Sequence, residues 1–119
     1  MKSEFRNIFH EIPETLSEEL FQNLAECGNV RIERIISDGQ ATPEGTWYDQ
    51  SWDEWIMLLS GSAGLLFEED GQTRHLVPGD HVLIPLGCRH RVEWTDPAQK
   101  TVWLAVHILN SAQKERITE

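Results

Sequence analysis

Two stretches of the chain contain residues with polar or ionisable side chains that are spaced by even numbers of positions. Tyr48, Gln50 and Glu54 lie an even number of positions apart, and His90 opens a later stretch in which Val92 follows at the same spacing. Residues spaced in this way on an extended chain share one face. If both stretches face one interior, a carboxylate, an imidazole and a phenol meet there. Carboxylates and imidazoles bind transition metals, and all three groups transfer protons.

His107 is a further candidate, near the end of the last apolar stretch. Trp103, Ala105 and His107 share one face of an extended chain, and the apolar residues between them share the other. Alternation alone does not decide which face lines an interior. An inward His107 would add a second imidazole to the site, although a hydrogen-bonded inner histidine is the commoner case.

The elements that must position these residues are short strands. Apolar runs of strand length follow one another from Val30 onward, separated by turn signals such as Asp70-Gly71 and Pro78-Gly79. Many short strands between turns are typical of a β-sandwich or a closed barrel. We therefore predict an all-β barrel over about residues 30–110.

One segment, residues 14–27, predicts a helix. Thr15-Leu-Ser-Glu18 has the pattern of a capping box, and apolar residues follow at helical spacing at Leu16, Leu20, Phe21 and Leu24. Gly28 would end the helix in a left-handed conformation. We expect this short helix to dock over one face of the domain.

Length and charge limit the organisation and the partners. The 119 residues, 39% hydrophobic and 25% charged, suit one globular domain over residues 1–119. The formal net charge of −10 would repel a phosphate backbone, so nucleic acid and anionic membranes are poor partners. Cys27 and Cys88 lack C-x-x-C spacing and the N-terminus is too polar for a signal peptide, which favours the cytoplasm.

The turns also carry a family pattern. Gly79-Asp-His-Val-Leu-Ile-Pro85-Leu-Gly87-Cys-Arg-His90 resembles the second cupin motif, with Trp94 near its end in place of the usual Asn. Glu54-Trp-Ile-Met-Leu-Leu-Ser-Gly61 resembles the end of the first motif. Over about residues 45–110 the chain thus resembles small single-domain bacterial cupins. The resemblance implies a double-stranded β-helix, also called a jelly-roll barrel, with one central pocket.

The resemblance also implies where a metal would bind. In metal-binding cupins the first motif supplies His-x-His and a Glu, and the second supplies a His. Glu54 and His90 match their positions, but Tyr48 and Gln50 replace the two histidines of the first motif. We therefore expect a divalent ion (Fe, Zn, Mn or Ni) on Gln50, Glu54, His90 and His107, with Tyr48 as the catalytic proton donor. Gln50 is the weakest ligand of this set, since its oxygen binds such ions less tightly than imidazole does.

Alternatives stand beside that metal site. Asp49 would replace Gln50 if a bulge shifted the register by one residue. Glu54 could instead pair with an arginine in a structural contact. Arg89 and Arg91 beside His90 are either a solvated pair, or one of them holds a carboxylate or phosphate of the substrate at the barrel mouth.

The five tryptophans are many for a chain of this length. We expect Trp47, Trp94 and Trp103 to wall the pocket for a flat or apolar ligand. Core packing and a dimer interface are the other uses of such residues.

Three functions remain open from the sequence. The first is a metal-dependent enzyme acting on a small molecule, as an oxygenase, isomerase or lyase. The second is a metal-free cupin that binds or senses a small ligand without catalysis. The third is a structural partner protein whose pocket its own side chains fill. In each case we expect a homodimer, from the resemblance and from the apolar strand faces.

Overall fold

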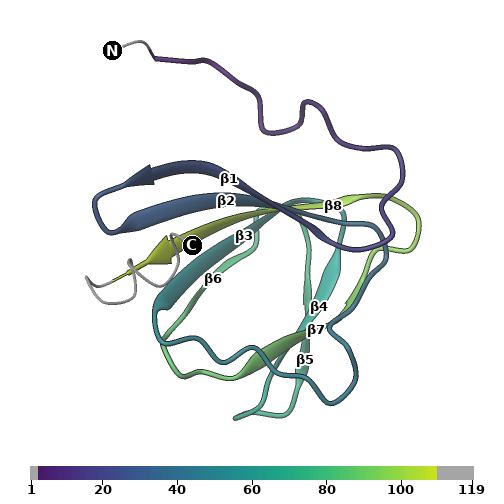
Figure 1. Cartoon of the computed structure of the whole chain (residues 1–119). Helices are drawn as coiled ribbons and strands as arrows, with labels where there is room; N and C mark the ends of the chain where they lie inside the picture. Colours follow the sequence, from purple (N-terminus) through teal and green to yellow (C-terminus); the bar gives the residue numbers. More distant parts are fainter. Residues whose placement is uncertain (1–2, 110–119) are drawn as a thin grey trace.

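The computed structural model describes residues 3–109, and every regular element in this range is a β-strand (Figure 1). The strands are β1 (Leu20–Cys27), β2 (Val30–Ser37), β3 (Asp53–Ser60), β4 (Ala63–Phe67), β5 (Thr73–Leu76), β6 (His81–Ile84), β7 (His90–Thr95) and β8 (Thr101–Ile108). Across residues 3–109 no helix is long and apolar enough to cross a membrane. The predicted all-β class is confirmed.

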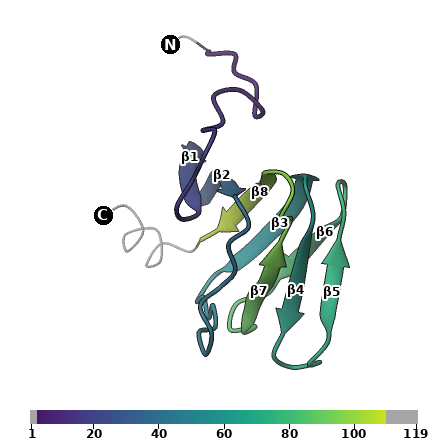
Figure 2. The ribbon, with the colours of Figure 1, turned by 90° about the vertical axis from the view of Figure 1, so that its right-hand side faces the viewer.

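The strands form two antiparallel sheets. The larger has the order β1-β2-β8-β3-β6, and the smaller has the order β5-β4-β7 (Figure 2). The buried core lies between them and draws on both: Ile56, Leu58, Ala63, Leu65, Leu76, Ile84, Trp103 and Ala105. Because neighbours on a strand point to opposite faces, each strand offers only alternate residues to this interior.

The predicted helix over residues 14–27 is wrong, because its second half is strand β1. Leu20 pairs with Ile36 and Cys27 with Val30, so β1 and β2 form a hairpin with a two-residue Gly28-Asn29 loop. Gly28 has φ +59°, which suits the first position of such a loop as well as a helix end. The edge of β2 supplies pairing partners along Leu20–Cys27, with one register shift between Asn23 and Ala25, and this tertiary pairing outweighs the local helical pattern.

The segment before β3 is fixed beside β7 by backbone hydrogen bonds. Tyr48 and His90 exchange two of them, with N···O distances of 2.8 and 3.1 Å. The Gly87 amide donates to the Gln50 carbonyl at 2.7 Å. These bonds hold Tyr48 and Gln50 against the start of β7, where His90 lies.

Arg91 strengthens the same attachment. Its guanidinium donates to the carbonyls of Thr42 at 3.0 Å and Thr46 at 3.1 Å. Its hydrogen-bonding capacity is therefore spent largely on this loop, and the structure gives it no position from which to bind a substrate anion in the central pocket.

Gly61 closes the turn between β3 and β4 where no side chain fits. It has φ +83°, and a Cβ there would lie 2.7 Å from Thr101 Cα and 2.8 Å from Lys100 O. We predict that Gly61→Ala lowers the free energy of unfolding by about 3 kcal/mol or more, because backbone strain and overlap add. Gly71→Ala is the control, with φ +65° but open space around it, and should cost about 1–2 kcal/mol. Urea denaturation of both variants measures their free energies of unfolding. Equal losses of stability in the two variants would contradict a steric overlap at Gly61.

Candidate functional site

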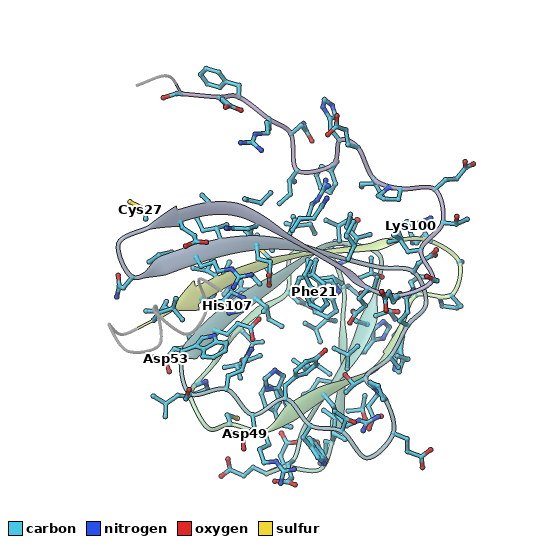
Figure 3. The ribbon with its side chains drawn as sticks, in the orientation of Figure 1. Phe21, Cys27, Asp49, Asp53, Lys100 and His107 are labelled. Carbon is cyan, nitrogen blue, oxygen red and sulfur yellow. The ribbon has the colours of Figure 1, made fainter. Side chains whose placement is uncertain are left out.

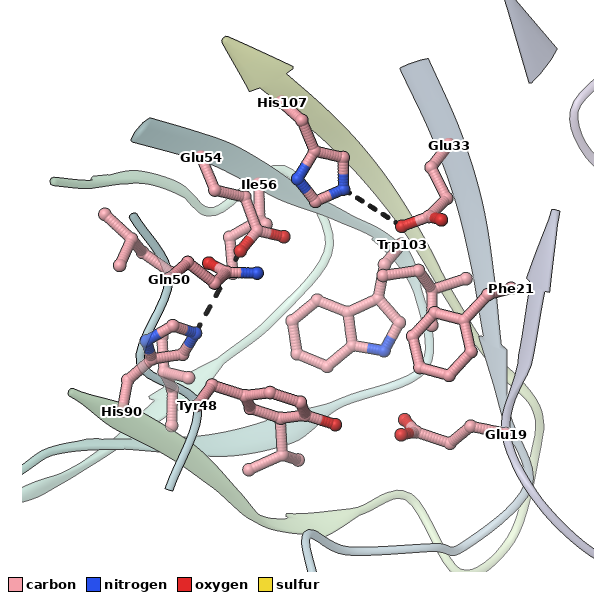
Figure 4. A pocket seen from close by; sticks show the side chains of 14 residues that line it. Glu19, Phe21, Glu33, Tyr48, Gln50, Glu54, Ile56, His90, Trp103 and His107 are labelled. Atoms are coloured by element: carbon pink, nitrogen blue, oxygen red, sulfur yellow. Dashed lines mark hydrogen bonds and ion pairs between the residues drawn. The ribbon is translucent and has the colours of Figure 1, made fainter. Parts of the chain in front are cut away.

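A cavity of about 90 Å³ lies between the two sheets. His107 and Phe21 point into the space that the sheets enclose (Figure 3). Alternate residues of neighbouring strands contribute, such as Glu33 and Ile35 on β2. Figure 4 shows the lining side chains, which are Glu19, Phe21, Glu33, Ile35, Tyr48, Gln50, Glu54, Ile56, Leu65, Ile84, His90, Val92, Trp103 and His107.

Most of the site residues expected from the sequence line this cavity. They are Tyr48, Gln50, Glu54, His90, Trp103 and His107. The structure also decides which face of β8 is inward, because Trp103 and His107 are 3% and 6% exposed and line the pocket. The strands around β8 determine this orientation.

Trp47 and Trp94 do not line the pocket, so their predicted place there is wrong. Trp47 is the neighbour of inward-facing Tyr48 and points the other way, under the guanidinium groups of Arg89 and Arg91. Trp94 follows a bulge in β7, where the partner of Leu65 is Val92 but the partner of Gly64 is Trp94. The extra residue, Glu93, reverses the alternation and turns Trp94 outward.

His90 is held in one orientation by the backbone. Its Nδ1 lies 2.9 Å from the carbonyl oxygen of Cys88. A carbonyl only accepts hydrogen bonds, so Nδ1 carries a proton and the neutral ring keeps a lone pair on Nε2. That nitrogen faces the Glu54 carboxylate at 4.0 Å, which is beyond hydrogen-bond distance. A backbone carbonyl that fixes the tautomer in this way is typical of histidines that bind metals.

Glu54 and Gln50 place two more acceptors beside this lone pair. Burial raises the pKa of the Glu54 carboxyl, while His107, His90 and the Gln50 amide lower it and Glu33 raises it further. Oε1 of Gln50 is buried without a hydrogen-bond partner. An imidazole nitrogen, a carboxylate and an amide oxygen thus meet with no donor among them to satisfy Gln50.

His107 is engaged on both ring nitrogens. The indole Nε1 of Trp52 donates to Nδ1 at 2.9 Å, and Nε2 lies 3.0 Å from Oε1 of Glu33. Because indole N–H is only a donor, Nδ1 accepts, and Nε2 carries the proton that it gives to the carboxylate. Glu33 also pairs with Arg31 at 3.0 Å. While these bonds hold, His107 has no lone pair for a metal ion.

Glu19, Phe21 and Glu33 also line the pocket, although the sequence pattern did not predict them there. Oε2 of Glu19 accepts a 2.6 Å hydrogen bond from Ser37 Oγ. Glu19 and Phe21 are two positions apart, as are Glu33 and Ile35, so strand alternation would have found both pairs. The helical interpretation of residues 14–27 hid the first pair.

The phenol of Tyr48 keeps its proton over a wider pH range than an exposed tyrosine. Burial raises its pKa, and the carboxylates of Glu19 and Glu54 raise it further, against a hydrogen bond with Thr42 that lowers it. Tyr48 therefore remains a hydrogen-bond donor at neutral pH.

The donor set can be compared with the needs of a metal ion. Within residues 3–109, no three His, Cys, Asp or Glu side chains are placed to share one ion. A divalent cation would take Glu54, His90 and the unpartnered Gln50 oxygen as its protein ligands. This mixed set of one nitrogen and two oxygens fits such an ion with open positions left for another molecule.

Glu19 should make stability depend on pH. Burial raises the pKa of its carboxyl, against the lowering effect of the Ser37 hydrogen bond. The folded protein then binds this proton more tightly than the unfolded chain, so ionisation of Glu19 destabilises the fold. We compare the free energy of unfolding of the wild type with that of Glu19→Gln. The wild-type value minus the variant value should fall as the pH rises from the ordinary pKa of an unfolded-state glutamate through the raised pKa of folded Glu19, and should then level off. Urea denaturation at several pH values measures this difference, and Glu18→Gln controls for the loss of one surface charge. A difference that rises with pH would contradict the destabilising role of ionised Glu19.

Comparison with solved structures identifies the fold. A proposed mannose-6-phosphate isomerase from Ralstonia eutropha JMP134 is 49% identical, with 91% of this chain and 100% of that chain covered and a TM-score of 0.87. The polyketide cyclase RemF from Streptomyces resistomycificus is 25% identical over 79% of this chain and 67% of that one, with a TM-score of 0.67. A cupin superfamily protein from Desulfitobacterium hafniense DCB-2 is 21% identical over 83% and 84% of the two chains, also with a TM-score of 0.67.

Among curated proteins, none matches the chain. The family model of the cupin domain matches residues 36–107, a span that runs from the end of β2 into β8 and includes Glu54, His90 and His107. The predicted double-stranded β-helix is thereby confirmed, and the chain belongs to the cupin family.

Proposed function

We propose that the barrel pocket binds a small molecule together with a divalent cation held by Glu54, His90 and Gln50. One observation carries this proposal. Oε1 of Gln50 is buried without a hydrogen-bond partner, and it lies in the same pocket as the Nε2 lone pair of His90 and the Glu54 carboxylate, which are 4.0 Å apart. Buried acceptors need a proton donor or a cation, because leaving them unpaired costs free energy.

The separate groups would have separate tasks. The cation would act as a Lewis acid on an oxygen of the bound molecule. Tyr48, which is protonated and lines the same pocket, would donate a hydrogen bond or a proton to that molecule. His107 would stay outside the cation's ligand set and keep Glu33 in place through its Nε2 proton.

The similar proteins support a small organic ligand without choosing it. RemF is named a polyketide cyclase, and the Ralstonia protein a proposed mannose-6-phosphate isomerase. A phosphorylated sugar is poorly supported here, because no lysine or arginine is among the described residues that line the pocket. Phosphate sites normally rely on such residues or on backbone amides at a helix end.

A metal-free binding protein is the second candidate. It is favoured by the replacement of both first-motif histidines and by the absence, in residues 3–109, of three His, Cys, Asp or Glu side chains that could share an ion. In that case N–H or O–H groups of the ligand would donate to His90, Glu54 and Gln50.

Metal content separates the two candidates. We predict that wild-type protein, reconstituted separately with manganese, iron, nickel and zinc and then desalted, retains about one equivalent of at least one of them. Glu54→Gln and His90→Gln should weaken binding at least about tenfold, as expected for loss of a ligand. His107→Gln should keep the metal, because both of its nitrogens already have partners in the protein.

Elemental mass spectrometry on folded, matched samples gives the readout. Glu68→Gln and His75→Gln remove the same kinds of group from outside the central pocket and serve as controls. A wild type that retains none of the four metals would reject the cation and leave the metal-free binder.

A further inference from the structure

We infer that the ligand of this pocket is a small molecule with an ammonium group, which binds Glu19 at the end of the pocket walled by Phe21, Tyr48 and Trp103. This inference rests on the proposed function in one respect, that the pocket binds a small molecule. It does not depend on the cation at Glu54 and His90.

The charge of the lining points to a cationic group. Three carboxyl side chains, Glu19, Glu33 and Glu54, line the cavity, whereas no described lining residue is a lysine or arginine. A carboxylate or phosphate on the ligand would face these groups without a compensating side chain. An ammonium would face them with a favourable interaction, strengthened by the low polarity of the surroundings.

Of the three carboxyl groups, Glu19 is the one left for a ligand. Glu33 already accepts from His107 and pairs with Arg31. Glu54 belongs to the cluster with His90 and Gln50. Glu19 has one hydrogen bond from the described residues, from Ser37 to Oε2, which leaves Oε1 to accept from a ligand.

A relay of buried groups holds Glu19 in position. The indole Nε1 of Trp103 lies 3.2 Å from Ser37 Oγ, and Ser37 in turn donates to Glu19. Ser37 is fully buried and Trp103 nearly so. The carboxylate is thus oriented before any ligand arrives, which lowers the entropic cost of binding.

Aromatic rings complete the surroundings of Glu19. In Figure 4 the Glu19 carboxylate lies near the Phe21 ring, and the Tyr48 hydroxyl points toward it. Phe21 is 51% exposed, so this end of the pocket is open to solvent and can admit a ligand. A carboxylate beside aromatic rings is a combination that binds ammonium ions, by charge and by cation–π attraction.

Three probes of one carbon skeleton test the charge preference. Benzylamine, benzyl alcohol and benzoate are titrated into wild-type protein at neutral pH and followed by protein NMR, with the Trp103 indole signal as a reporter of the pocket. We expect benzylamine to bind at least tenfold more tightly than either of the others. Equal or tighter binding of the alcohol or of benzoate would overturn the inference.

Variants test the position. Glu19→Gln should weaken benzylamine binding at least tenfold and leave benzyl alcohol unchanged, while Glu18→Gln should change neither. Unchanged benzylamine affinity in Glu19→Gln would overturn the assignment to Glu19. The wild-type selectivity needs no variant, so it stands as a test even if Glu19→Gln does not fold.

The outcomes separate this inference from the proposed function. Benzyl alcohol binding in the pocket as well as the amine would overturn the ammonium preference and leave small-molecule binding intact. Failure of all three probes to move the Trp103 signal would overturn the inference, and failure of the protein to retain a metal as well would count against the proposed function.

Discussion

The pairing of β8 with β2 on one side and β3 on the other is the constraint on which the site depends. It sets His107 opposite Arg31 on β2 and opposite Glu54 on β3. Because side chains alternate along a strand, a slip of one residue would turn Trp103 and His107 to the outer face. Glu33 would then lose the imidazole that donates to it inside the barrel. The polar groups of the pocket are therefore as dependent on register as its apolar core.

The polar side chains of this pocket differ in how far the protein itself satisfies them. His107 receives one hydrogen bond and gives one, so its ring is complete without a ligand. His90 is tied to the backbone on one nitrogen only, and it faces Glu54 and the unpartnered oxygen of Gln50. The first arrangement stabilises the barrel. The second leaves acceptors that a bound group must fill, and this is why we place function there.

The two ends of the pocket make different demands on one ligand. The end at His90 and Glu54 offers acceptors to a cation or to donor groups, and the open end offers the carboxylate of Glu19 among aromatic rings. Tyr48 lies between them as a protonated phenol. A small molecule that spans the pocket would thus meet a hydrogen-bond donor at its middle, the Glu19 carboxylate at the open end, and the proposed cation on Glu54 and His90 at the other.

The sequence by itself determined the all-β class and the cupin motifs, with Glu54 and His90 at matching motif positions, because turn residues and motif spacing are local. It did not determine the strand nature of residues 20–27, since a helical pattern and Gly28 fit both a helix and a hairpin until β2 supplies the hydrogen bonds. Nor did it place Trp94, whose direction a bulge at Glu93 reverses, or the inward face of β8. Those depend on pairing between strands far apart in the chain, which only the tertiary structure decides.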